Sequence, residues 1–341
     1  MAMRSKRAVD LLRTASIIGL KVLTEPFLFW LRAEVSVESF RGHRFPVYLL
    51  VALANTTVVD CAWQDLPFTF LNLPLSLFLR NIRVRHLTSR PEGKIRVVLD
   101  TNAAKGVDAT LVLRCNYYSA AARSGTLFLP YFAHPVFYRE QLHAWARQNR
   151  GTDRAVRLFF AGTVSEAHSS RFRFPILPRD RIIARVQEWL ARRSPADTGR
   201  VRLVMTNDPR KRLGKHSLWL PDYMRAMADA DFFLCPPGWL MPHAHNLVEA
   251  LAVGTIPVTN YHEYMKPPLT PGVNCVGFRS LAELDQALES VLSMRGEEIA
   301  ALRAGAIRYY DTYVDPESFG RRFLQVARRC DELVVNDESG A

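Results

Sequence analysis

The stretch "DADFFLCPPGWLMPHAHNLVEALAVGTIPVTNY" (Asp229–Tyr261) decides the fold of this chain. An apolar run ends at Cys235, a Pro/Gly turn follows, a helix-prone segment stops at Gly254, and a second apolar run ends at Thr259. Strands that alternate with helices through short links form parallel sheets covered on both faces. The stretch therefore predicts one strand–helix–strand unit of an α/β protein.

Runs of the same kind surround this unit. The strand-like segments "VRLFFAG" and "VRLVMTN" alternate with the helix-like segments "RDRIIARVQEWLARR" and "LPDYMRAMADA", and "IRVVLDTN" and "ATLVLRCNYYS" read as earlier buried strands. The polar segment between Gln148 and Arg154 predicts a domain boundary. We therefore predict two α/β lobes with parallel sheets and a cleft between them. The expected domains are residues 1–150 and 151–330, followed by a tail over 331–341 in which a closing helix gives way to a frayed end.

The composition narrows the class of protein. With 341 residues, 48% hydrophobic and 23% charged, the chain is long enough for two cores and reads as globular. The formal net charge of +12 favours an anionic partner. The five cysteines are widely spaced without a CxxC pair, which argues against a zinc or dithiol site and favours a cytoplasmic location.

The segment Phe45–Leu79 carries only two charged residues, Asp60 and Asp65. Its uncharged runs are shorter than the roughly 20 residues of a spanning helix, and prolines interrupt it. We predict a first core strand with its loops. A surface that dips into a bilayer remains open as the alternative.

The predicted helix in the opening stretch begins near Pro242 or His243. Its register places Leu247, Ala250 and Leu251 on one buried stripe. His245 and Glu249 then share the opposite side, where a ligand can reach them, and the free amides at the helix start suit a phosphate. A solvated glutamate and a surface histidine are the alternative interpretation.

The opening stretch, together with "VRLFFAG" and "LPDYMRAMADA", resembles the nucleotide-sugar-binding domain of GT-B glycosyltransferases, most of all the exostosin-like group. The shared pattern is a cysteine-containing apolar strand, a Pro/Gly loop, a helix and a "G-x-I-P-V" strand. It covers roughly Arg157 to Arg328 and is most specific from Phe232 to Val258. The resemblance implies two Rossmann-like lobes in a GT-B architecture. It also implies transfer of a sugar from a nucleotide diphosphate sugar to an acceptor on the N-terminal domain.

The resemblance also implies site residues. Glu249 would hold the donor ribose, while Gly162 and Thr163 would allow close approach of the diphosphate. The candidates that face the diphosphate and sugar from the loop and helix start are Pro237, Gly238, His243, His245 and Asn246. The two histidines and Asn246 stand where the family tends to place an arginine. Further candidate cations, each also readable as a solvated side chain, are Arg171, Arg173, Arg210, Lys211, Arg212 and Lys215.

Met241 stands where retaining enzymes of this kind often carry a second glutamate, so an inverting reaction is favoured. An inverting transfer needs a general base, and Asp100 and His134 are the candidates from the N-terminal domain. Asp60 and Asp65 are weaker candidates. Asp100 is equally readable as a turn former or helix cap, and His134 as a packed side chain.

The leading hypothesis is a hexosyl-type glycosyltransferase of polysaccharide biosynthesis, inverting, metal-independent and without a cofactor. The acceptor expected is a glycan or a lipid-linked glycan, with peripheral contact at the inner membrane face. The Asp229–Asp231 triplet precedes a strand, which is a poor position for a metal-binding DxD motif. A nucleotide-sugar epimerase or hydrolase of the same fold is the first alternative. A nucleic-acid-binding protein is the second, although the basic residues are scattered and carry no known binding signature.

Overall fold

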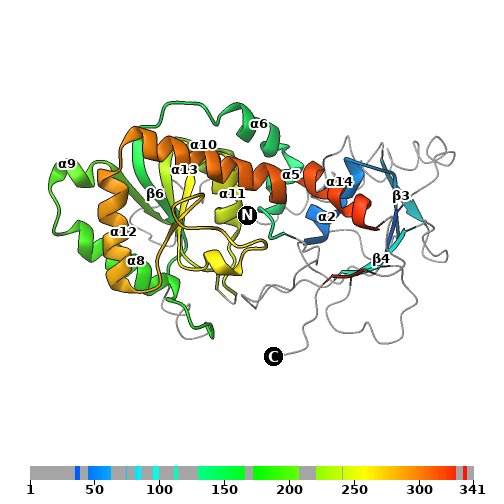
Figure 1. Cartoon of the computed structure of the whole chain (residues 1–341), viewed down its shortest axis with the longest axis horizontal. Coiled ribbons are helices and arrows are strands. Elements are labelled where there is room, and N and C mark those ends of the chain that lie inside the picture. Colours follow the sequence, from blue (N-terminus) through cyan, green and yellow to red (C-terminus); the bar gives the residue numbers. More distant parts are fainter. Residues whose placement is uncertain are drawn as a thin grey trace, which may run out of the picture.

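The computed structural model describes residues 35–38, 45–62, 74, 81–85, 95–99, 111–113, 130–165, 172–206, 220–239, 241–327 and 333–335. These residues form two sheets with helices around them (Figure 1). Every pair of strands in them runs parallel. The predicted α/β class with two parallel sheets is confirmed; the cleft and the domain boundaries stay predictions.

The first sheet has six strands in the order β11-β5-β4-β1-β2-β3. The strands are β1 (Val35–Glu38), β2 (Val59–Ala62), β3 (Ile82–Arg85), β4 (Ile95–Leu99), β5 (Leu111–Leu113) and β11 (Leu333–Val335). Because β11 pairs with β5, the segment predicted as a frayed tail contributes a strand to this sheet. Its Leu-Val-Val run has the β-branched character that suits an edge strand.

The second sheet has five strands in the order β10-β9-β8-β6-β7. They are β6 (Val156–Gly162), β7 (Val201–Met205), β8 (Ala230–Cys235), β9 (Ile256–Thr259) and β10 (Val276–Gly277). From β6 the chain passes to β7 on one side and then crosses to β8 on the other side. The strand order therefore reverses between β6 and β8, and open α/β sheets bind ligands at such a reversal.

Helices pack around the second sheet, and one of them contacts the first sheet. The α-helices that link the strands of the second sheet are α8 (Arg179–Leu190), α9 (Pro195–Thr198), α10 (Leu220–Ala228) and α11 (His245–Ala252). The other helical elements are α2 (Phe45–Ala54), α5 (Pro135–Arg139), α6 (Leu142–Gln148), η2 (His262–Tyr264), α12 (Leu281–Ser293), α13 (Gly296–Tyr309), the π-helical turn η3 (Tyr310–Val314) and α14 (Pro316–Ala327).

The segment predicted as a first core strand with its loops contains strand β2, but it begins with helix α2, which was not predicted. Helix α2 is apolar on every side, and Tyr48 to Ala54 are fully buried. A helix without a polar face is stable only when protein or lipid surrounds it, and here α14 packs along it (Figure 1). The side chains of Tyr48 to Ala54, which belong to the segment that suggested a bilayer surface, therefore lie in the protein core, while residues 63–73 and 75–79 of that segment lie outside the described residues. Among the helices of the described residues, none has the length and apolarity that crossing a membrane requires.

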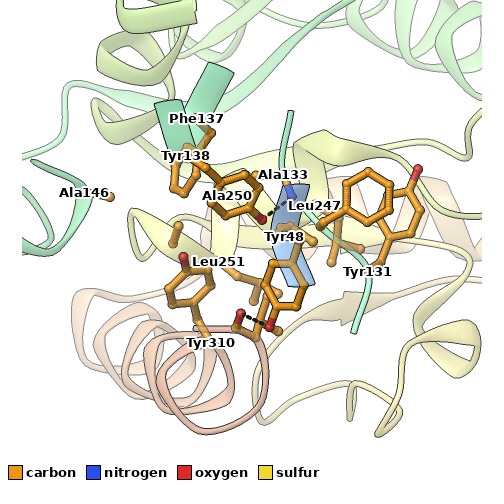
Figure 2. Close-up of a cluster of buried hydrophobic side chains, with 14 of the residues drawn as sticks. Tyr48, Tyr131, Ala133, Phe137, Tyr138, Ala146, Leu247, Ala250, Leu251 and Tyr310 are labelled. Carbon is orange, nitrogen blue, oxygen red and sulfur yellow. Dashed lines mark hydrogen bonds between the residues drawn. The ribbon is translucent and has the colours of Figure 1, made fainter. Parts of the chain in front are cut away.

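An aromatic core joins α2 to elements of the second half of the chain (Figure 2). The Tyr48 hydroxyl donates to the Val314 carbonyl (2.8 Å), and the Ala133 amide donates to the Tyr138 hydroxyl (2.9 Å). Leu247 of α11 lies in the same cluster. Helix α14 thus returns from the second sheet and packs on α2.

The contact between α14 and α2 predicts a strong effect of Gly320→Ala. A Cβ atom at Gly320 would lie 2.2 Å from the Ala52 carbonyl oxygen, so the two helices must move apart. Overpacking of this kind costs about 1–3 kcal/mol, more than the roughly 1 kcal/mol by which alanine favours a helix over glycine. We expect a lower thermal unfolding midpoint.

Gly296→Ala is the matched control, because nothing lies within 4 Å of a Cβ there. Its midpoint should equal or exceed that of the unmodified protein. A Gly320→Ala midpoint at or above the unmodified value would contradict the packing of α14 on α2.

Candidate functional site

Arg179 bridges the ends of β6 and β8, where the strand order reverses. It is the first residue of α8. Its Nε donates to the Pro237 carbonyl (2.9 Å), just beyond β8, and its Nη1 donates to the Thr163 carbonyl (3.2 Å), just beyond β6. Asn260, which follows β9, donates to the Leu177 carbonyl (2.9 Å) and so fixes the chain two residues before Arg179. The guanidinium therefore lies at the switch point of the sheet.

The charge of Arg179 has no carboxylate partner among the described residues, since its guanidinium donates to two carbonyl oxygens there. Arg185, on the same helix, pairs with Asp285 and Glu188. Burial lowers the pKa of Arg179 below its ordinary value. A cation that is partly removed from water without a counter-ion is costly, and a bound anion offsets that cost. The arrangement is suited to a phosphate or diphosphate group.

The loop after β8 is tightly constrained at Gly238. The Gly238 amide donates to the Pro242 carbonyl (3.1 Å). A Cβ at this position would lie 2.4 Å from the His243 oxygen and 2.9 Å from the Met241 oxygen, so only glycine fits. Pro237 on the preceding side is buried. The predicted candidates Pro237 and Gly238 therefore hold the loop shape next to Arg179.

Two of the predicted donor-binding residues, His243 and His245, pack on the segment that precedes α5. Their rings stack on Tyr131, with centroid distances of 4.8 Å and 5.5 Å. The ring N–H of His243 at Nε2 donates to the Tyr264 carbonyl (2.9 Å), and that of His245 at Nδ1 donates to the Phe132 carbonyl (2.8 Å). His245 therefore joins α11 to residues 131 and 132, and His243 joins the loop before α11 to Tyr131.

Glu249 does not lie on an open face of α11, as its register predicted. The side chains from Leu247 to Ala252 are all buried, and Glu249 is 3% exposed. The physical reason is that α11 is surrounded: β8 and β9 contact it, and so do α6, α10, α13 and η3. A helical register states which residues share a side, but not how many sides are covered.

The Glu249 carboxylate receives two hydrogen bonds inside the protein. Its Oε1 accepts from the His134 amide (2.9 Å), and the Tyr223 hydroxyl donates to the carboxylate. Burial raises the pKa of Glu249 to about 7, and the two donors oppose that rise only in part. Glu249 is thus a buried anchor between α11, α10 and the segment before α5.

His134, predicted as a general base, caps α5. Its Nδ1 accepts from the Val136 amide (3.3 Å), which leaves the proton of a neutral ring on Nε2. Its ring also meets the His245 ring edge-on at 5.8 Å. A base role therefore requires His134 to give up its cap or change tautomer.

Of the remaining predicted residues, some lie in the part of the chain that the structure describes and others lie outside it. The Thr163 hydroxyl shares a hydrogen bond with Thr206 (3.0 Å), Gly162 ends β6, and Arg173 is exposed. Asn246 is partly buried in the first turn of α11, and its Oδ1 has no hydrogen-bond partner among the described residues. Outside the described residues lie Asp65, Asp100, Arg171, Arg210, Lys211, Arg212 and Lys215, while Asp60 belongs to β2.

The Asp229–Asp231 triplet lies at the amino end of β8, away from the switch point. The Asp231 carboxylate pairs with Arg157 (3.0 Å) and Arg303 (2.5 Å), and Asp229 accepts from the Ala155 amide (3.1 Å). Within the part of the chain that the structure describes, no group of three or more His, Cys, Asp or Glu side chains is arranged to hold a metal ion.

Two residues of the site, Arg179 and Tyr223, were not predicted. Arg179 is the first residue of a helix that follows a strand and a loop, and this position in the sequence could have indicated a residue at the carboxyl edge of the sheet. Tyr223 lies on α10 in "LPDYMRAM", where nothing in the sequence marks it as a partner of Glu249.

The buried carboxyl group predicts a pH dependence of stability. The ordinary pKa of a glutamate is 4.5, and that of folded Glu249 is about 7, so the folded state holds this proton over a range where the unfolded state has lost it. The stabilising effect is fully present below pH 4.5 and is lost as pH rises through 7, a change of about 3 kcal/mol at about 1.4 kcal/mol per pKa unit. The thermal midpoint of the unmodified protein minus that of Glu249→Gln should fall between pH 5 and pH 8.

Tyr223→Phe provides a second measurement. It removes a donor that lowers the pKa of Glu249, so the decrease in the midpoint difference should extend to higher pH. Parallel midpoint curves for the unmodified protein and Glu249→Gln would contradict the buried carboxyl group.

No protein-family model and no curated protein matches the sequence. Among solved structures, the chain is similar to HepE of Anabaena in complex with UDP and glucose, at 12% identity over 87% of this chain and 100% of that chain, with a TM-score of 0.48. It is also similar to AviGT4, a glycosyltransferase involved in avilamycin A biosynthesis (14% identity, 87% and 97% covered, TM-score 0.44). A third is WaaG, a glycosyltransferase involved in lipopolysaccharide biosynthesis (13%, 86% and 99%, TM-score 0.42). Membership of the exostosin-like group stays a prediction.

Proposed function

We propose that the chain is a glycosyltransferase that moves a sugar from a nucleotide diphosphate sugar to a glycan or lipid-linked acceptor. The observation that carries this proposal is the partly buried guanidinium of Arg179 between the ends of β6 and β8, with no acidic partner among the described residues. A diphosphate supplies the missing negative charge at the position where α/β sheets bind their ligands.

The donor diphosphate contacts Arg179 from one side and the start of α11 from the other. The amino end of α11 carries a partial positive charge, and the side-chain NH2 group of Asn246 in its first turn is a donor suited to a phosphate oxygen. Gly238 keeps the loop between β8 and α11 compact. During transfer, the same donors stabilise the charge that develops on the leaving diphosphate.

The ribose of the donor is proposed to lie beside Glu249, as the sequence implied. Because the carboxylate already accepts from His134 and Tyr223, ribose hydroxyls must share it or displace one of these donors. Donor binding would then loosen or rearrange the segment before α5. Arg179 is accordingly the principal donor contact in this proposal, and Glu249 a secondary one.

The inverting, metal-independent mechanism also belongs to the proposal. Met241, not a glutamate, follows the Gly238 turn, and Asp231 is engaged in ion pairs with Arg157 and Arg303. The cationic support for the leaving group is therefore assigned to Arg179. The acceptor is assigned to residues 1–150, with contact to a lipid-linked acceptor at a membrane surface as part of the proposal.

Arg179→Gln tests this function, with Arg181→Gln as the matched control because Arg181 is exposed on the same helix. The measurement is the thermal midpoint with UDP, GDP, dTDP, ADP, CMP and their sugar derivatives. One nucleotide should raise the midpoint of the unmodified protein and of Arg181→Gln. Arg179→Gln should lose this rise, with binding weakened at least about tenfold, which corresponds to about 1.4 kcal/mol.

The ligand-free midpoint separates a binding role from a structural one. Glutamine keeps an amide donor for one of the two carbonyl groups, and removing a buried charge without a counter-ion offsets the loss of the other hydrogen bond, so the ligand-free midpoint of Arg179→Gln should change little. A strongly lowered midpoint, or a nucleotide response equal to that of the unmodified protein, would count against the assignment. Binding to DNA or RNA but to none of the nucleotides would instead favour the nucleic-acid alternative.

A further inference from the structure

Trp239 is an exposed tryptophan in the loop that carries the proposed donor site. It is 48% exposed and lies two residues beyond Pro237, whose carbonyl accepts from Arg179. Two residues of extended chain span at most about 7 Å. The indole is therefore attached within reach of a group bound at Arg179.

Few large apolar side chains are exposed in the described part of the chain: Trp239, Val273 and Tyr313. Tyr313 belongs to η3, where its ring contacts Tyr309 (centroids 5.3 Å apart) and the Arg322 guanidinium lies 5.3 Å from its centroid. Val273 belongs to the turn whose carbonyl packs on Gly305. Of the three, Trp239 is the one at the carboxyl edge of the second sheet, where ligands bind.

Hydrogen bonds hold the backbone near Trp239. The Arg179 bond fixes Pro237, and the bond from the Gly238 amide to the Pro242 carbonyl closes the turn around Trp239. A Cβ atom at Gly238 would lie 2.4 Å from the His243 oxygen, so this turn requires glycine at that position. An aromatic ring on a constrained turn loses little entropy when a ligand stacks on it.

The course of the loop indicates which part of the donor meets the indole. From Pro237 at the switch point, the loop runs toward His243 and His245, which stack on Tyr131 of the segment leading from the first half of the chain. In the proposed reaction the transferred sugar points toward that half, where the acceptor binds. Along the loop, Trp239 stands between the Arg179 contact at Pro237 and these two histidines.

We propose that Trp239 stacks on the sugar ring of the nucleotide diphosphate sugar and is a specificity-determining residue of the donor site. The proposal rests on the proposed function. A sugar presents C–H groups on one face, which pack on the electron-rich face of an indole, while its hydroxyls remain free for polar contacts. Trp239 thereby distinguishes a sugar-bearing donor from the nucleoside diphosphate that remains after transfer.

The test is calorimetric binding to UDP-glucose, UDP-N-acetylglucosamine, GDP-mannose and dTDP-glucose, each paired with its nucleoside diphosphate. Trp239→Leu keeps apolar bulk without a ring, and Trp239→Phe keeps a flat ring. For the donor that binds, Trp239→Leu should weaken the sugar nucleotide about tenfold, the scale of an aromatic contact together with its buried area, and leave the nucleoside diphosphate unchanged. Trp239→Phe should retain most of the affinity. Tyr313→Leu, which removes an exposed ring elsewhere, should change neither.

The other outcomes separate this inference from the proposed function. Equal weakening of the sugar nucleotide and the nucleoside diphosphate by Trp239→Leu would mean stacking on the base, and would overturn the inference while the donor site stood. Unchanged binding of both would also overturn it. If the unmodified protein binds none of the seven compounds, the proposed function fails and this inference fails with it.

Discussion

The reversal of strand order between β6 and β8 is the constraint on which the rest of the site depends. It makes the ends of these two strands neighbours, although β7 lies between them in the sequence.

 The start of α8 and the loop after β8 must therefore meet, and Arg179 is the residue that joins them. Its two hydrogen bonds to carbonyl groups fix the guanidinium without neutralising it. A structural requirement of the sheet thus produces a site for an anion.

A second feature, the enclosure of α11, links this site to the first half of the chain. Helix α11 follows the loop beside Arg179 and is buried among elements of both halves, including the aromatic core around Tyr48 and Tyr138 (Figure 2). Its polar residues are used for that enclosure: His245 binds the Phe132 carbonyl, and Glu249 binds the His134 amide. Movement of the segment before α5 is therefore coupled to the groups that surround the proposed donor.

Much of the second sheet could be predicted from the sequence, because its strands are short apolar runs that end at glycine, proline or polar residues. The strand ending at Cys235 and the strand ending at Thr259 are confirmed. The apolar run that forms α2 could not be assigned in this way, because it has no periodicity and a helix buried on all sides resembles a buried strand. The pairing of β11 with β5 depends on contacts between the two ends of the chain, which local patterns do not contain.

Only part of the geometry of the candidate site could be predicted from the sequence. The loop from Pro237 to Gly238 and the start of α11 do lie at the carboxyl edge of the sheet. The burial of Glu249 depends on how many elements surround α11, and the importance of Arg179 depends on carbonyl groups from two separate loops. Both are consequences of tertiary packing, so spacing along one helix could not reveal them.

The most direct test of the central claim is a crystal structure of the protein soaked in turn with UDP, GDP and dTDP. The account predicts that one of these nucleotides binds with diphosphate oxygens about 3 Å from the Arg179 guanidinium, between the ends of β6 and β8. A nucleotide whose diphosphate lies elsewhere, with Arg179 still bonded only to the Thr163 and Pro237 carbonyls, would contradict it.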